Sequence, residues 1–201
     1  MDDETPFNPL DKRNLGESVV EALLERPPSS LANVPAFRGA GIYAIYYAGD
    51  YPAYQTLARE NRSEPKTPIY VGKAIPKGAR KGAALNFTDR SRALSKRLQE
   101  HEASIRAVSS LRIEDFLYRK LIVDDVWIAL GEALVIEKFQ PLWNVAVDGF
   151  GNHDPGAGRY GGKRPLWDEL HPGRDWAGRC APAKLNRKEI LAAIARYFQK
   201  R

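Results

Sequence analysis

The sequence predicts an α+β fold in which a small, mostly antiparallel three-stranded sheet is flanked by helices. Two aromatic runs in the first half, GIYAIYY and PIYVG, alternate as strands do and are bounded by glycine or proline. Further along, two segments carry apolar residues at helical spacing, with a third alternating run between them. The 201-residue chain is long enough for one domain with a sizeable core.

The first element is expected to be a helix over Leu15–Arg26, because its apolar residues recur at helical spacing until PPSS ends the pattern. The strand GIYAIYY follows, and alternation places Tyr43 and Tyr47 on one face and Tyr46 on the other, as a packing residue. A polar insertion with a short helix in YQTLAREN precedes the second strand, which Gly72 ends. The two strands are expected to pair antiparallel, in a register that the sequence leaves open.

The remaining elements follow in order along the chain. They are a Gly- and Lys-rich loop (73–89), an amphipathic helix (91–108), a strand (115–124), a helix ended by Pro141 (127–141), a glycine-rich surface loop (142–165) and a last helix (186–201). Asn186 and Glu189 form a capping box at the start of the last helix, whose apolar residues suit core or dimer packing.

Charge favours a polyanionic partner. The chain has 31 Lys and Arg against 25 Asp and Glu, a net charge of 31 − 25 = +6. Nine of the basic residues lie between positions 72 and 107, against three acids. A solvated basic face is the alternative explanation, but this concentration favours nucleic acid.

The single cysteine, Cys180, excludes an intramolecular disulfide and favours a reducing compartment. No apolar run approaches 18 residues, and the N-terminus is acidic and polar. We therefore expect neither a membrane span nor a secretory signal, and a cytoplasmic location.

Several polar residues stand where packing would not select them. Arg97 and His101 are four apart on the middle helix, where the alternative is a surface pair flanking the core. Glu132 interrupts an apolar run, either as an exposed residue or as a buried acid with a partner. Phosphodiester hydrolysis uses such groups: a carboxylate for a divalent ion, a cation for the developing charge, and phenols whose pKa a nearby cation such as Lys73 lowers.

The series GIY at 41–43, YVGK at 70–73, Arg97, Glu132 and Asn144 after PLW resembles the GIY-YIG nuclease superfamily over roughly residues 39–144. The second tripeptide departs from the family pattern by Val in place of Ile, a conservative change in a strand. The resemblance implies one endonuclease domain, with extensions over 1–38 and 145–201. It implies the catalytic set Tyr43, Tyr70, Arg97, His101, Glu132, Asn144 and Lys73.

The resemblance also implies roles. Glu132 would ligate Mg²⁺ or Mn²⁺, and Arg97 would contact the scissile phosphate. One tyrosine, for which we favour Tyr43, would be or would orient the general base, and His101 would assist. Asn144 would support the site by hydrogen bonding, and Lys73 would tune the phenols.

A closer resemblance is to the type II restriction endonucleases that cut CCGCGG. It is carried by the Arg-x-x-x-His spacing, the long insertion and the tail WNVAVDGFGNHDPGAGR. It implies double-stranded DNA as substrate, a homodimer for a palindromic site, and a cognate DNA methyltransferase as a functional partner. A repair or homing nuclease and a non-catalytic DNA-binding protein are the alternatives.

Basic residues outside the catalytic set are candidates for DNA contacts. They are Arg80, Lys81, Arg90, Arg92, Lys96, Arg159 and Arg174, with Arg59, Arg62, Lys77, Lys163 and Arg164 as further possibilities. A zinc site built from the three histidines and Cys180 is disfavoured, because no ligand spacing typical of zinc occurs.

Overall fold

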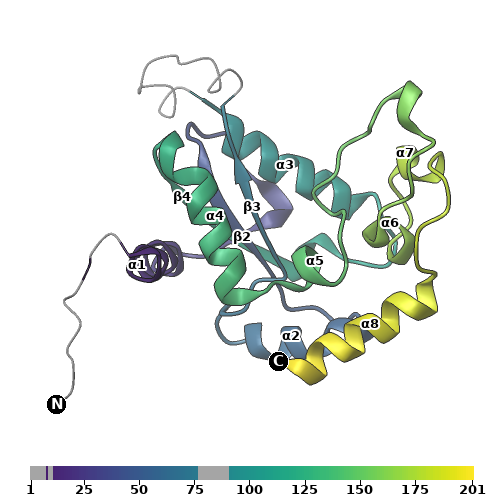
Figure 1. Ribbon diagram of the computed structural model, residues 1–201, viewed down its shortest axis with the longest axis horizontal. Helices are drawn as coiled ribbons and strands as arrows, with labels where there is room; N and C mark the ends of the chain where they lie inside the picture. The colour runs from purple at the N-terminus through teal and green to yellow at the C-terminus, as the bar shows by residue number, and fades with distance from the viewer. Residues whose placement is uncertain (1–7, 9–10, 77–90) are drawn as a thin grey trace.

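A four-stranded antiparallel sheet forms the centre of the fold in the computed structural model, which describes residues 8, 11–76 and 91–201 (Figure 1). The strands are β1 (Ser29–Ser30), β2 (Gly41–Tyr47), β3 (Tyr70–Ala74) and β4 (Phe116–Ile122), in the spatial order β1-β4-β2-β3. The prediction of three strands is therefore wrong by one. β1 pairs with β4 over two residues only, which is too short to show alternation in a sequence.

Helices surround this sheet (Figure 1). The α-helices are α1 (Lys12–Leu24), α2 (Gln55–Asn61), α3 (Ala93–Arg106), α4 (Asp125–Phe139), α5 (Leu142–Val145), α6 (Leu166–Leu170), α7 (Asp175–Gly178) and α8 (Arg187–Lys200). Short 3₁₀ turns lie at Leu31–Asn33, Pro52–Tyr54, Ile113–Asp115 and Ala157–Arg159. None of the helices in the described part of the chain is both long enough and apolar enough to span a bilayer.

Strand β2 is buried along its whole length because helices cover both of its faces. Ile42 and Tyr46 belong to the apolar cluster that joins the sheet to α1 and α4. Tyr43 and Tyr47 belong to a second cluster with α3 and the C-terminal extension. The predicted division of the tyrosines between two faces is confirmed, and Tyr46 is a packing residue.

The predicted helices and strands are present with ends shifted by a few residues. Helix α4 ends where Gln140 adopts a left-handed conformation, φ 44°, directly before Pro141. The capping box of α8 is confirmed, since Asn186 accepts from the Glu189 backbone and Glu189 accepts in return. Ile190 and Ile194 of α8 are buried, so this helix packs in the core.

The glycine-rich segment 142–165 differs from its prediction as a surface loop in its first part, whereas residues 152–163 are mostly exposed as predicted. It begins with α5, and the side chains of Trp143, Val147 and Phe150 are buried in the same cluster as Tyr43. The segment has no periodicity because each aromatic residue is placed by a separate turn. It therefore brings the C-terminal extension against α3 and β3, where the candidate site lies.

Candidate active site

The pairing of β2 with β3 explains why a glycine follows the second tyrosine. In this register Tyr43 lies directly opposite Gly72, so its phenol extends over the glycine backbone. A Cβ atom on residue 72 would lie 2.4 Å from the Tyr43 hydroxyl and 3.0 Å from the Tyr70 ring. The absence of a side chain at Gly72 thus creates the space in which the two phenols approach each other.

Tyr43 forms a hydrogen bond with a histidine of helix α3. Its Oη lies 2.6 Å from His101 Nε2, and both side chains are buried. The Tyr70 ring contacts both, with centroids 6.2 Å from Tyr43 and 5.3 Å from His101. Phe150 stacks on the imidazole at 4.5 Å and 18°. His101 is therefore part of the core, and the alternative of a surface pair at the edge of α3 is wrong for it.

Burial keeps these rings neutral. It lowers the pKa of His101 well below its usual value, and the charge of Arg97 adds to that effect. Burial likewise raises the pKa of Tyr43, to which Tyr70 contributes, while Arg97 acts in the opposite direction. Burial also raises the pKa of Tyr70. The expectation that a nearby cation leaves the phenols with lowered pKa values is therefore wrong in its net direction.

Arg97 is the cation beside the phenols, and the C-terminal extension holds it. Its Nη2 donates to the Gly151 carbonyl at 2.5 Å, and its Nη1 donates to Glu100 at 2.9 Å and contacts His153. Gly151 is needed here because a Cβ on it would lie 2.4 Å from the Tyr70 hydroxyl. His153 is thus a neighbour of the site that the sequence analysis considered only as a ligand of the disfavoured zinc site.

Glu132 of α4 forms an ion pair with Lys73 of β3, at 2.5 Å between Oε2 and Nζ. Lys73 lies opposite Ile42, so it projects toward α4, away from the face that carries Tyr43. Glu132 still lies near enough to raise the pKa of Tyr43 and Tyr70. The partly buried acid therefore has a partner, and Lys73 neutralises that acid while Arg97 is the cation that acts on the phenols.

Asn144 fixes the exposed edge of β3. Its side-chain amide donates to the Val71 carbonyl and accepts from the Val71 N–H, both at 2.9 Å. The backbone N–H of Trp143 donates to the Ile69 carbonyl at 2.9 Å. Helix α5 thus satisfies backbone groups that an edge strand would leave unpaired, on either side of Tyr70. Asn144 acts through β3 and is a positioning residue.

Arg174 supports the same site from inside the extension. Its five N–H groups donate to both oxygens of Asp168 and to the carbonyls of Gly149, Phe150 and Asn152, at 2.5 to 3.0 Å. The guanidinium carbon of Arg174 lies 4.8 Å from the ring centroid of Trp167 and 4.8 Å from that of Trp176. The side chain is 5% exposed. The prediction of Arg174 as a DNA contact is therefore wrong, because every donor is used inside the protein, three on the turn that carries Phe150 and two on Asp168.

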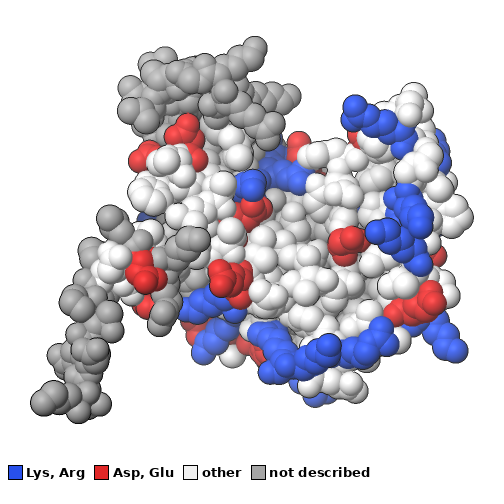
Figure 2. Space-filling view, viewed as in Figure 1, with Lys and Arg blue, Asp and Glu red and all other residues white. Residues whose placement is uncertain are grey.

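The other DNA-contact candidates fall into two groups. Arg92, Lys96 and Arg159 are exposed, as are Arg59, Arg62 and Lys163, although Arg62 pairs with Asp50; Arg164 is half-buried and pairs with Glu169. Arg80, Lys81, Arg90 and Lys77 lie outside the described residues. Figure 2 shows Lys and Arg side chains gathered over α8 and over the C-terminal extension, with a further group over α3.

The described residues contain no cluster of three or more Asp, Glu, His or Cys side chains that could hold a metal ion. The disfavoured zinc site is accordingly not assembled there. Glu132, a partly buried single carboxylate whose charge reaches Tyr43 and Tyr70, fits a hard divalent cation such as Mg²⁺, which keeps most of its waters. Its Oε2 contacts Lys73, so the carboxylate would be shared between the ion and that ammonium group.

A second buried tyrosine–histidine pair lies deeper in the same cluster. Tyr54 Oη is 2.6 Å from His171 Nε2, Trp143 Nε1 donates to Tyr54 Oη at 3.0 Å, and Ser110 Oγ lies 2.7 Å from His171 Nδ1. The sequence did not reveal this pair, because Tyr54 and His171 lie 117 positions apart.

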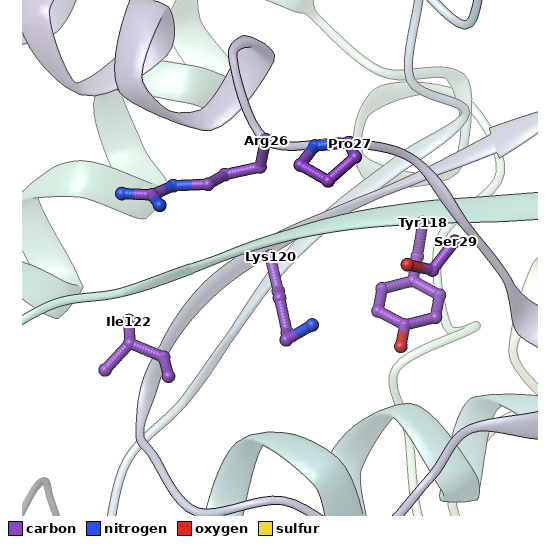
Figure 3. A pocket seen from close by; sticks show the side chains of 6 residues that line it. All are labelled: Arg26, Pro27, Ser29, Tyr118, Lys120 and Ile122. Atoms are coloured by element: carbon purple, nitrogen blue, oxygen red, sulfur yellow. The ribbon is translucent and has the colours of Figure 1, made fainter.

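A separate hollow of about 250 Å³ lies over β1 and β4, lined by Arg26, Pro27, Ser29, Tyr118, Lys120 and Ile122 (Figure 3). In the order β1-β4-β2-β3 it lies on the side of the sheet away from β3. The hollow is therefore not part of the Tyr43 site.

Comparison with known proteins gives one family. The model described as the Eco29kI GIY-YIG domain matches residues 35–198, which is most of the chain. A search of curated protein sequences found no match.

Proposed function

Because the chain belongs to the Eco29kI GIY-YIG family of restriction endonucleases, we propose that it is a type II enzyme that cuts double-stranded DNA at CCGCGG with a divalent metal ion. The match covers nearly all of the C-terminal extension, including the turn that holds Arg97 and Phe150, and only residues 35–38 of the N-terminal extension. Membership of this family supports restriction-type nuclease activity for the chain. The recognition sequence, the metal and the role of tyrosine are the proposal.

The observation that carries the proposed chemistry is the 2.6 Å hydrogen bond between Tyr43 Oη and His101 Nε2 beside Arg97 and Glu132. Both rings are neutral, so the phenol can donate its proton to a bare Nε2. As a water attacks the phosphorus, its proton passes to Tyr43 Oη and the phenol proton passes to His101, while the P–O bond to the leaving oxygen breaks and that oxygen takes a proton from solvent. The imidazolium that results is balanced by negative charge developing on the phosphate, which Arg97 also stabilises.

Glu132 would hold the metal ion, and a bound divalent ion would neutralise the phosphate and polarise its oxygens. The ion pair with Lys73 limits where the carboxylate can turn. Tyr70 packs against Tyr43 and His101 and lies under Gly151, so it restrains the phenol.

A homodimer would place two such sites on the two strands of a palindrome. Exposed Arg92, Lys96 and Arg159 would contact the DNA backbone on either side of the site. A DNA methyltransferase of the same restriction-modification system would protect the host's own sites. The single cysteine, Cys180, suits action in the cytoplasm.

A matched pair of duplexes tests the proposal. One carries CCGCGG, and the other carries the same six bases as the palindrome CCCGGG in identical flanks. We expect cleavage of the first duplex alone, with Mg²⁺ or Mn²⁺ present and not with EDTA. Equal cutting of both duplexes would contradict the recognition sequence, and unchanged cutting in EDTA would contradict the metal.

A further inference from the structure

The exposed end of Arg97 contacts two side chains that have no role in the proposed chemistry. Glu100 accepts from Nη1 at 2.9 Å, and the imidazole of His153 contacts the same nitrogen. His153 is 63% exposed and Glu100 is 50% exposed, whereas Arg97 is 17% exposed. The Arg97 guanidinium is thus largely covered, and its Nη1 is held by two side chains that are themselves exposed.

The contact requires a neutral imidazole. A guanidinium only donates hydrogen bonds, so the ring nitrogen of His153 must accept, and a doubly protonated ring has no acceptor left. Burial and the charge of Arg97 lower the pKa of His153, and Arg174 adds to the effect, whereas Glu100 raises it. Arg159, Lys163 and Cys180 line the same hollow as His153.

The position of His153 is imposed by the fold, because it follows a fixed turn. Arg174 holds the carbonyls of Gly149, Phe150 and Asn152, directly before His153. Phe150 is stacked on His101, and the Gly151 carbonyl accepts from Arg97. The C-terminal extension therefore places His153 beside the guanidinium, directly after a turn that is held by hydrogen bonds.

We propose that His153 is a positioning residue for DNA cleavage, whose neutral ring holds the Arg97 guanidinium toward the scissile phosphate and releases it when the ring takes up a proton. The proposal rests on the proposed nuclease function. It predicts that the cleavage rate falls as the pH is lowered, which is the acid limb of the pH profile. This fall should reflect protonation of His153. The other two histidines titrate elsewhere, since the pKa of His171 is lowered to about 3 and that of His101 is lowered well below its usual value.

The test is the pH profile of single-turnover cleavage with saturating enzyme and Mg²⁺, for the wild type, His153→Ala, His153→Gln and Glu100→Gln. His153→Ala should cut about ten- to hundredfold more slowly at pH 8, with duplex affinity in EDTA unchanged within about threefold, because a hydrogen bond to a charged group is lost. His153→Gln keeps an acceptor that does not titrate, so it should restore much of the rate and abolish the acid limb. Glu100→Gln should keep the limb and move it to lower pH, since Glu100 raises the pKa of His153.

An acid limb unchanged in His153→Gln, or wild-type cutting by His153→Ala, would overturn the proposal. A measurement without DNA separates this result from the proposed function. The NMR signals of the His153 ring and of the Arg97 guanidinium should titrate together in the free protein, whether or not it cuts. Independent titration of the two would overturn the contact itself.

Discussion

The protein contains two buried tyrosine–histidine hydrogen bonds of equal length, Tyr43–His101 and Tyr54–His171, both 2.6 Å. The first lies beside Arg97 and Glu132, at the edge strand β3. The second is closed at both ends by neutral groups, because Trp143 donates to Tyr54 and Ser110 meets His171. Both pairs are fully buried, so what distinguishes them is the charge around the first pair and its place at the edge of the sheet.

The two pairs also share neighbours. The ring centroid of Trp143 lies 4.6 Å from that of Phe150 and 6.3 Å from that of His171. Phe150 in turn stacks on His101. The aromatic cluster thus connects them, so a change in one can disturb the packing of the other. The variants below are chosen to separate an effect on cleavage from an effect on stability.

The largest expected effect comes from removing the carboxylate that only the first pair has nearby. Glu132→Ala should reduce cleavage at least about a thousandfold, because the proposed metal ion loses its protein ligand. Affinity for the duplex in EDTA should stay within about threefold. Glu137→Ala, at an exposed position of the same helix, is the matched control and should cut normally. Normal cutting by Glu132→Ala would remove the main chemical difference between the pairs.

The next effect concerns the turn that joins the extension to the first pair. Arg174→Lys should lower the free energy of unfolding by about 3 kcal/mol, since an ammonium group cannot replace five directed donors and Asp168 stays buried. Cleavage should fall as well, because Phe150 and Gly151 lose their support. Urea unfolding measures the first effect. Arg179→Lys, an exposed arginine nearby, should change neither quantity measurably.

A smaller effect, common to both pairs, is lability in acid. The pKa of His171 is lowered to about 3 by burial and by Arg187, against about 6.5 in the unfolded chain. The unfolded state therefore binds the proton first, and this stability is present above about pH 6.5 and lost as the pH falls toward 3. The loss should be about 1.4 kcal/mol per pH unit for each such histidine.

Urea unfolding between pH 7 and pH 5 measures that slope. His171→Gln should make the slope shallower while leaving the acid limb of cleavage in place. A slope unchanged by this substitution would show that His171 is not buried as a neutral ring.

Periodic segments of the fold could be predicted from sequence. Apolar residues that alternate or recur on one face predict β2, β3, α3 and α4. The capping box that begins with Asn186 predicts the start of α8. β1 could not be found, because a two-residue strand carries no pattern. The burial of side chains between residues 142 and 150 does not follow from periodicity, although Trp143 and Phe150 beside a glycine-rich run are a usable signal.

The site was predictable as a set of residues and not as an arrangement. The sequence named Tyr43, Tyr70, Arg97, His101 and Glu132, but their contacts depend on tertiary pairing. Lys73 was assigned to the phenols because it follows Tyr70 closely, whereas strand alternation turns it toward α4. Arg174 is predicted from sequence as a DNA contact, because nothing local reveals that carbonyls 22 to 25 positions away accept hydrogen bonds from its guanidinium.

The comparison of Tyr43→Phe with Tyr54→Phe tests the account most directly, by single-turnover cleavage per folded molecule and by urea unfolding of the same samples. Each variant removes one hydroxyl from a 2.6 Å tyrosine–histidine bond. Tyr43→Phe should cut about 10² to 10⁴ times more slowly. Tyr54→Phe should cut at the wild-type rate and lose about 1–3 kcal/mol of stability, because Trp143 Nε1 and His171 Nε2 are left without a partner. Wild-type cutting by Tyr43→Phe, or an equal loss of cutting in both variants, would contradict the account.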